Sequence, residues 1–332
     1  MENKRIAFFD NCKFFLILLV AVGHFIDQNT ASSPIYRGLF LFIYTFHMPA
    51  FFFMSGLFDK RTTPFSKRLN KAVYYFSLYL VLKTVITLVQ WAFTNRFSFH
   101  LLTEVGIPWF CLVLGVFTLL TGLFEKAKVN LTTVFFLSVL LACFAGFDKS
   151  LGDYLALSRT IIFYPFYLLG VILEKEKLLN LIRKRWLRAC GLLILCAFLA
   201  VCLLMTARLY PLRQMFTGRN PFRDSWRAFG PLVRLGCYLL TGVIGLAFMA
   251  VVPQRGLGKI TDFGRRTMQV YFWHRPVLYV MVYLHLNDSV LSLGAAGKVI
   301  WILLACVLTL ILSLNIFSFP TAHLQKWLQR KN

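Results

Sequence analysis

Ten long apolar runs alternate along the whole chain with short segments rich in lysine and arginine. An α-helix needs about 20 apolar residues to cross the hydrocarbon core of a bilayer, so each run predicts a transmembrane helix. The runs lie at roughly 12–27, 38–58, 72–93, 107–124, 130–147, 160–173, 188–207, 231–252, 268–286 and 299–319. The sequence therefore predicts an all-α fold, a polytopic integral membrane helical bundle of about ten transmembrane helices, with residues 1–332 in a single domain.

The composition excludes most other classes of protein. Of the 332 residues, 58% are hydrophobic and only 15% are charged, too few to cover the surface of a soluble enzyme. The formal net charge of +23 would also suit a nucleic-acid binder, but the basic residues lie between the apolar runs instead of forming one wetted face. The eight cysteines lie in or beside apolar runs without metal-ligand spacing. We therefore expect free thiols, no metal site and no nucleic-acid partner.

Positive charge is concentrated on one side of the predicted membrane. With the N-terminus in the cytoplasm, 23 of the 36 Lys and Arg residues fall in cytoplasmic segments and ten fall outside, while Lys83, Arg234 and Arg275 lie within runs. Cytoplasmic loops of membrane proteins carry such an excess. We expect both termini in the cytoplasm and a multi-pass protein of a bacterial-type inner or plasma membrane, with membrane lipid as a partner.

One predicted outer segment departs from this charge pattern. Residues 208–230 hold five arginines and no lysine, interleaved with Phe, Trp and Tyr. Arginine beside aromatic rings suits planar recognition of carboxylate, phosphate or sugar faces, so Arg219 and Arg223 are candidate substrate-binding residues. A segment that contacts anionic lipid headgroups would have the same composition.

The first run carries ionisable residues where a bilayer disfavours them. Asp10 precedes Lys13 by three residues, a spacing that allows an ion pair on a helix. Lys13 and His24 are eleven residues apart, which places them on the same helix face, about 16 Å apart along the axis. Ionisable groups at membrane depth are functional hypotheses by default, so His24 is a candidate catalytic residue.

Four further segments hold candidate residues. In the second run, His47 is followed by Pro49, Ser55 and Gly56, a composition that suits a pocket wall in which Ser55 binds substrate. Trp109 opens the fourth run, where it is either an interfacial anchor or a substrate contact. The remaining candidates are cations and a histidine at the ends of later runs: Arg159, Arg265, Arg266 and His274. Arg265 and Arg266 suit anion binding near a helix N-terminus, although charge that only sets the topology would look the same.

This inventory narrows the chemistry. The sequence has no HExxH, Walker A or GxSxG motif, and no paired carboxylates suited to glycoside hydrolysis. Histidine can act as a general base toward an alcohol, and cationic side chains can hold phosphates or an oxyanion. The residues favour acyl transfer from a phosphate-bearing thioester to a hydroxyl.

Motifs in a fixed order then indicate a family. The set begins with Asp10, Lys13 and His24, and continues with FHMPAFFFMSGLF (46–58), PWFCLVLG (108–115), RTIIFYPFYLLG (159–170) and LGKITDFGRRTMQVYFWH (257–274). Over about residues 5–320 the chain resembles the membrane-bound acyltransferase 3 family. Lysine at position 13, where most members have arginine, is usual in the fucose 4-O-acetylase-like branch of acetyltransferases.

The resemblance implies an O-acyltransferase that moves an acyl group, usually acetyl, from acyl-CoA to a hydroxyl of a cell-surface glycan or glycolipid. No bound cofactor is expected, because acetyl-CoA is the donor substrate. The implied donor-binding residues are Asp10, Lys13, Arg159, Arg265 and Arg266.

In this scheme His24 acts as general base or carries the acyl group transiently. Its partner is either His47 or His274, and the sequence does not choose between them. Trp109, Arg219 and Arg223 would face the acceptor. Two alternatives remain: a transporter or flippase for a lipid-linked sugar, and a non-catalytic sensor or scaffold.

Overall fold

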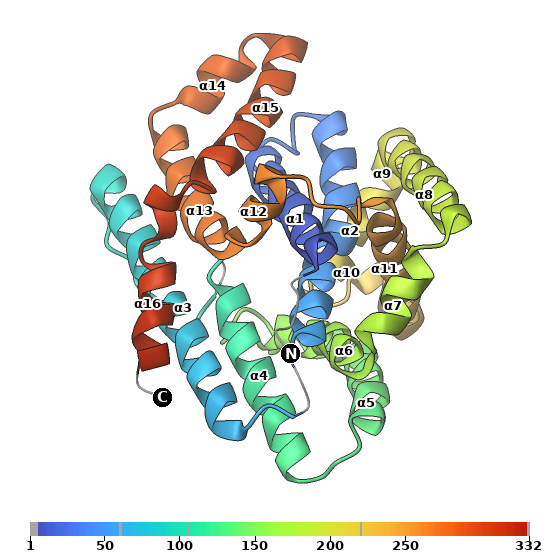
Figure 1. Ribbon diagram of the computed structural model, residues 1–332. Helices are drawn as coiled ribbons and strands as arrows, with labels where there is room; N and C mark the ends of the chain where they lie inside the picture. Colours follow the sequence, from blue (N-terminus) through green and yellow to red (C-terminus); the bar gives the residue numbers. More distant parts are fainter. Residues whose placement is uncertain (1–5, 60–61, 105, 220, 331–332) are drawn as a thin grey trace. The chain divides into compact units, whose positions relative to one another are not determined.

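The computed structural model describes residues 6–59, 62–104, 106–219 and 221–330, except for the side chains of 329 and 330. Within these ranges the secondary structure is helical, apart from one isolated β-bridge between Thr103 and Tyr154 (Figure 1). The predicted all-α class is confirmed. Five positive residues used to predict the orientation lie outside the described ranges: Lys4, Arg5, Lys60, Arg61 and Lys331.

The helices follow the predicted apolar runs. In chain order the α-helices are α1 (Ala7–Asp27), α2 (Pro34–Leu57), α3 (Phe65–Thr94), α4 (Trp109–Lys126), α5 (Leu131–Phe144), α6 (Leu157–Ile172), α7 (Lys175–Ile182), α8 (Arg185–Leu204), α9 (Thr206–Leu209), α10 (Arg213–Phe216), α11 (Gly230–Val251), α12 (Lys259–Gly264), α13 (Thr267–Tyr283), α14 (Leu286–Leu291), α15 (Gly294–Leu312) and α16 (Thr321–Arg330). Short 3₁₀-helices occur at η1 (Ala145–Phe147), η2 (Tyr210–Leu212), η3 (Asp224–Phe229) and η4 (Asn315–Ser318).

Seven helices of the described chain are long and apolar enough to cross a membrane: α1, α2, α3, α4, α8, α11 together with η3, and α15. An eighth candidate span joins α6 to α7 across a bend of 91°, either as a broken span or as a re-entrant loop. The other two predicted runs fall on shorter helices, α5 with 14 residues and α13 with 17. The chain is therefore a multi-pass membrane protein.

The chain folds into two compact units. The first holds Met1–Ile43, Val81–Phe99 and Val252–Asn332, and the second holds Tyr44–Leu80 and His100–Val251. Both α2 and α3 therefore contribute to each unit.

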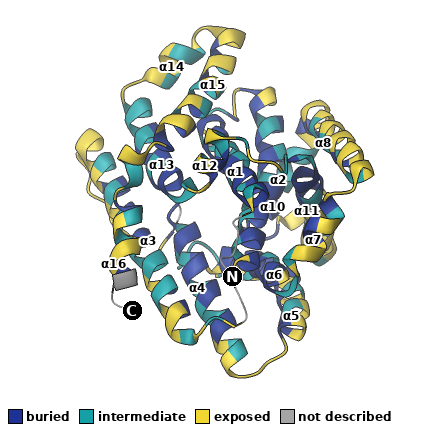
Figure 2. Cartoon of the chain, viewed as in Figure 1, coloured by how far each residue is buried: buried dark blue, intermediate teal, exposed yellow. Residues whose placement is uncertain are grey.

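The first unit is built around α1. This helix packs against α12, α13 and α15 (Figure 1). Fourteen of its 21 residues are buried, and Figure 2 shows it largely in the colour of buried residues. The indole Nε1 of Trp301 in α15 donates a hydrogen bond of 2.8 Å to the carbonyl oxygen of Phe25, which fixes the end of α1 against α15. Asp10 and Asn11 lie inside this packed core, whereas Lys13 and His24 are only partly buried.

In the second unit, two glycines let α2 and α6 approach closely. A Cβ atom on Gly56 would collide with the carbonyl oxygen of Tyr167, and one on Gly170 with the carbonyl oxygen of Phe53. In the same unit α8 packs against α11 but leaves most of its surface exposed, as Figure 2 shows. Such an apolar, exposed surface is what a lipid-facing helix presents.

The structure also changes two details of the sequence interpretation. The arginine-rich segment 208–230 is mostly short helical turns, α9, η2, α10 and η3, instead of an open loop. Arg68, counted above among the cytoplasmic loop charges, is 1% exposed and lies in the first turns of α3. Its charge is neutralised by two acids described below.

Candidate active site

Two histidines meet in the first unit. The ring of His24, in the last turn of α1, stacks on the ring of His274 in α13, with 5.3 Å between centroids and 30° between planes. His24 is half-buried, whereas His274 is 1% exposed. His274 is one of the two partners that the sequence left open for His24, and the two rings are in contact.

The hydrogen bonding of His274 defines its tautomer. Its Nδ1 lies 3.0 Å from the carbonyl oxygen of Val270, one turn earlier in α13. A carbonyl oxygen only accepts, so Nδ1 carries the hydrogen and Nε2 of the neutral ring is an acceptor. This Nε2 is buried and has no hydrogen-bond partner among the described residues. The pair therefore presents an imidazole nitrogen capable of receiving a proton.

A second cluster lies at the other end of α1. The Asp10 carboxylate, with its side chain 2% exposed, lies 3.5 Å from Lys13 Nζ and 3.5 Å from Arg265 Nε. The Lys13 and Arg265 side chains are 25% and 47% exposed, so both cationic groups reach the surface while the shared acid is buried. The predicted pairing of Asp10 with Lys13 is confirmed. Arg265 also meets Asp262 at 3.1 Å, on its exposed side.

Hydrogen bonds from α1 hold the segment that carries Arg265. The Asn11 side-chain amide donates to the carbonyl oxygens of Pro253 and Arg255, at 2.8 and 2.9 Å. Its Oδ1 accepts a hydrogen bond of 2.7 Å from the Thr261 hydroxyl in α12. Because all these groups are buried or partly buried, each would lose a partner if Asn11 were apolar. Sequence reasoning missed this role, although an Asp-Asn pair beside an apolar run was a visible signal.

Gly264, at the end of α12, allows α12 to pack closely against α1. A Cβ at this position would overlap the backbone carbonyl oxygen of Asp10, so only glycine lets α12 lie this close to α1. Arg265 follows Gly264 directly, so this close packing places its guanidinium next to the Asp10 carboxylate.

Arg266, predicted together with Arg265, has a different contact. Its Nη1 donates to the carbonyl oxygen of Ser313 at 3.1 Å. Gln269 donates to the carbonyl oxygens of Leu312 and Leu314, at 2.7 and 2.8 Å. The two side chains satisfy carbonyl groups at the C-terminal end of α15 that have no partner within the helix. This contact gives Arg266 a packing role.

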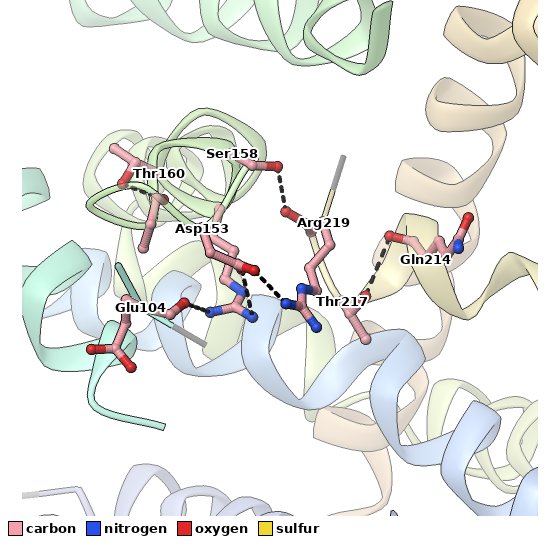
Figure 3. Close-up of polar contacts among 10 residues, drawn as sticks. Glu104, Asp153, Ser158, Thr160, Gln214, Thr217 and Arg219 are labelled. Atoms are coloured by element: carbon pink, nitrogen blue, oxygen red, sulfur yellow. Dashed lines mark hydrogen bonds and ion pairs between the residues drawn. The ribbon is translucent and has the colours of Figure 1, made fainter. Parts of the chain in front are cut away.

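In the second unit, Arg159 and Arg219 share one carboxylate, that of Asp153 (Figure 3). Arg159 is 6% exposed; its Nη2 lies 3.8 Å from Asp153 and its Nη1 donates to the carbonyl oxygen of Glu104 at 3.3 Å. Its guanidinium carbon also lies 4.9 Å from the centre of the Trp109 ring. The structure thus brings together Arg159, Trp109 and Arg219, which the sequence had divided between donor and acceptor.

Backbone contacts complete this cluster. The Ser158 hydroxyl donates a buried hydrogen bond of 2.7 Å to the carbonyl oxygen of Gly218, the residue before Arg219 (Figure 3). Arg223 is exposed and directs its guanidinium to the ring of Trp226, at 5.9 Å. The Arg159 cluster therefore joins the start of α6 to the segment after α10.

The candidates in α2 have local contacts. The His47 ring, 2% exposed, lies edge-on to Tyr44 with 4.7 Å between centroids. The Ser55 hydroxyl donates to the carbonyl oxygen of Phe51 at 2.8 Å, within the same helix. Both residues belong to the second unit.

A buried ion cluster in the second unit was missed. Arg68 lies 3.3 Å from Asp59 and 2.7 Å from Glu125, and the Tyr167 hydroxyl donates to Asp59 at 2.6 Å. Four helices or their ends, α2, α3, α4 and α6, supply these groups. Sequence reasoning assigned Arg68 to topology because its acidic partners are distant along the chain.

Comparison with known families agrees with this arrangement. A family model described as an acyltransferase domain matches residues 6–318. The chain belongs to the acyltransferase 3 family. It is accordingly a membrane acyltransferase, and the match includes every candidate residue named above. No curated protein and no solved structure matches the chain. Among the described residues of this family member, no group of three or more His, Cys, Asp or Glu side chains is placed to hold a metal ion.

Proposed function

We propose that this acyltransferase moves an acyl group, preferably acetyl, from acyl-CoA to a hydroxyl of a cell-surface carbohydrate or glycolipid. The stacked pair of His24 and His274 carries the proposal. In a chain of an acyltransferase family, His24 offers a half-buried imidazole, and the enclosed ring of His274 lies against it. Lysine at position 13 supports the fucose 4-O-acetylase-like branch.

The donor site in this proposal begins at the cationic cluster. Lys13 and Arg265, held by Asp10, bind the phosphates of CoA. From there the pantetheine arm follows α1 to His24; the helix is continuous between Lys13 and His24, which places them about 16 Å apart. Acyl-CoA enters as substrate, not as a resident cofactor, and from the cytoplasm, where both termini lie in the ten-span topology.

His24 is the reacting residue in the proposed step, since it is half-buried whereas His274 is enclosed. His24 takes the proton of the acceptor hydroxyl, and the oxygen attacks the thioester carbonyl. A carbon–oxygen bond forms, the carbon–sulfur bond breaks, and the CoA thiolate receives the proton. A variant of this step has His24 carry the acyl group transiently. His274 stacks on His24 and fixes the plane of its ring.

Trp109 and Arg219 remain proposed acceptor contacts, and Arg159 is now grouped with them. The single carboxylate of Asp153 balances only one of the two guanidinium charges, so these arginines suit sugar hydroxyls, ring faces or an anionic group. Arg223 and Ser55 remain proposed acceptor contacts, and His47 a secondary catalytic candidate.

Two measurements test the function together. Full-length protein in membranes is supplied with labelled acetyl-CoA, and CoA release is followed. Surface glycans of cells with and without the gene are compared by mass spectrometry. We expect CoA release and an acetyl group on one glycan that disappears without the gene. Loss of a glycan without any acetyl difference and without CoA release would instead indicate a transporter or flippase.

A further inference from the structure

Arg275, the residue after His274, has a partly buried cationic group that the proposed step does not use. Its Nη1 is buried and has no hydrogen-bond partner among the described residues. Its other terminal nitrogen, Nη2, lies 3.5 Å from the Tyr279 hydroxyl, at the limit of a hydrogen bond. A partly buried guanidinium with so few partners can still donate hydrogen bonds to a ligand.

The same guanidinium begins a row of aromatic rings. Its carbon lies 4.7 Å from the centre of the Tyr279 ring. Tyr279 stacks on Tyr283 with 6.2 Å between centroids and 23° between planes. Tyr283 in turn stacks on Phe93 of α3, at 5.2 Å and 11°. The row is half-buried, and Phe93 is 43% exposed, so a ligand could reach it.

The row and the histidine pair share helix α13, on different faces of it. Arg275, Tyr279 and Tyr283 are spaced by four residues, so they lie on successive turns of α13. His274 immediately precedes the first of them, and the whole row belongs to the same unit as His24. The rings cover one another's faces, so the apolar surface that remains for a ligand is the exposed part of Phe93 and the partly exposed sides of Tyr279 and Tyr283. Such surface suits the carbon–hydrogen groups of a sugar ring, and a guanidinium suits a carboxylate or phosphate.

We propose that Arg275, Tyr279, Tyr283 and Phe93 form a subsite for an anionic carbohydrate, a sugar that bears a carboxylate or a phosphate. The aromatic row receives the ring of the sugar and the guanidinium receives its anionic group. This inference rests on the proposed function, since it names the class of acceptor. It adds a specificity-determining residue, Arg275, that a neutral acceptor would not need.

Binding to full-length protein in zwitterionic nanodiscs tests the subsite. The probes are a nitrophenyl hexoside, the corresponding hexuronide and the corresponding hexose 6-phosphate, which differ in their anionic group. We expect the wild type to bind at least one anionic probe about 10-fold or more tighter than the neutral probe, as charge-assisted hydrogen bonds do. Arg275→Gln should reduce this ratio to about one, and Arg275→Lys should restore part of it. The two anionic probes distinguish carboxylate from phosphate.

Arg188→Gln is the matched control, since Arg188 is an exposed arginine in α8, and it should keep the ratio of the wild type. Equal affinities of the wild type for all three probes, or a preference that survives Arg275→Gln, would overturn the proposal. Such a result would leave Arg275 as a side chain that reaches for lipid headgroups. CoA release is measured on the same preparations. A preference for the anionic probe without CoA release would refute the acyltransferase scheme and leave the subsite standing.

Discussion

The imidazole rings of His24 and His274 lie stacked, 5.3 Å apart, although they come from opposite ends of the chain. Two imidazolium ions stacked in this way would repel each other. The His274 ring is held in place by the hydrogen bond from its Nδ1 to the Val270 carbonyl oxygen, and it is enclosed, whereas the His24 ring is half-buried. His274 is therefore suited to position the His24 ring for the proposed proton transfer.

Replacing His24 with alanine should abolish most of the activity. Removing a general base lowers the rate by about 10²–10⁴-fold. We expect kcat to fall by this amount, with little change in the affinity for acetyl-CoA, measured by CoA release and equilibrium binding. His285→Ala is the control, because His285 is an exposed histidine whose Nδ1 lies within hydrogen-bond distance of Asp288, at 3.0 Å. Activity of His24→Ala equal to that of the control would remove His24 from the mechanism.

Replacing Lys13 or Arg265 with alanine should weaken donor binding. Each group is partly exposed, so water and salt reduce its contribution, and we expect the KM for acetyl-CoA to rise by roughly 3- to 30-fold. The comparison donor is acetyl-pantetheine, which lacks the nucleotide phosphates and should show no such change. Lys259→Ala, at an exposed position of α12, is the control. An effect confined to the acceptor KM would place both cations outside the donor site.

Replacing Gly264 with alanine should destabilise the contact between α1 and α12. The added methyl group would overlap the Asp10 carbonyl oxygen, and forced overpacking of this kind destabilises proteins by about 1–3 kcal/mol. We expect a lower Tm in detergent, together with a raised KM for acetyl-CoA because Arg265 is displaced. Gly256→Ala is the control, since a Cβ at Gly256 would have no neighbour within 4 Å. Equal Tm values for the two variants would show that α12 can move away from α1 without loss of stability.

Replacing Arg68 with methionine should destabilise the second unit strongly. The change leaves Asp59 and Glu125 without their shared cation, and breaking a buried ion pair costs about 3–5 kcal/mol. Adding Asp59→Asn should recover part of the lost stability, because it removes one of the two carboxylates that Arg68→Met deprives of its cation. Thermal unfolding in detergent measures both, with the exposed Arg183→Met as control. A double variant less stable than Arg68→Met would contradict this account.

The sequence by itself determined the class of fold and the local parts of the site. Long apolar runs can only be helices in a membrane, because every backbone polar group must find its partner within the same segment. Helical spacing likewise predicted the pairing of Asp10 with Lys13, and the common face of Lys13 and His24, since both depend on residues of one helix. The lengths of the shorter spans were less determined, because packing and helix breaks decide where α5, α6 and α13 end.

Only the tertiary structure decided which helices meet. It stacked His274 on His24, brought Arg265 to Asp10, and directed Arg266 to the carbonyl oxygen of Ser313. It also joined Arg159 to Asp153 and Trp109, and enclosed Arg68 between two acids. Most of these contacts link residues of different helices, many of them far apart in the chain. They depend on close approach at particular positions such as Gly264, and the periodicity of a single helix contains no information about its neighbours.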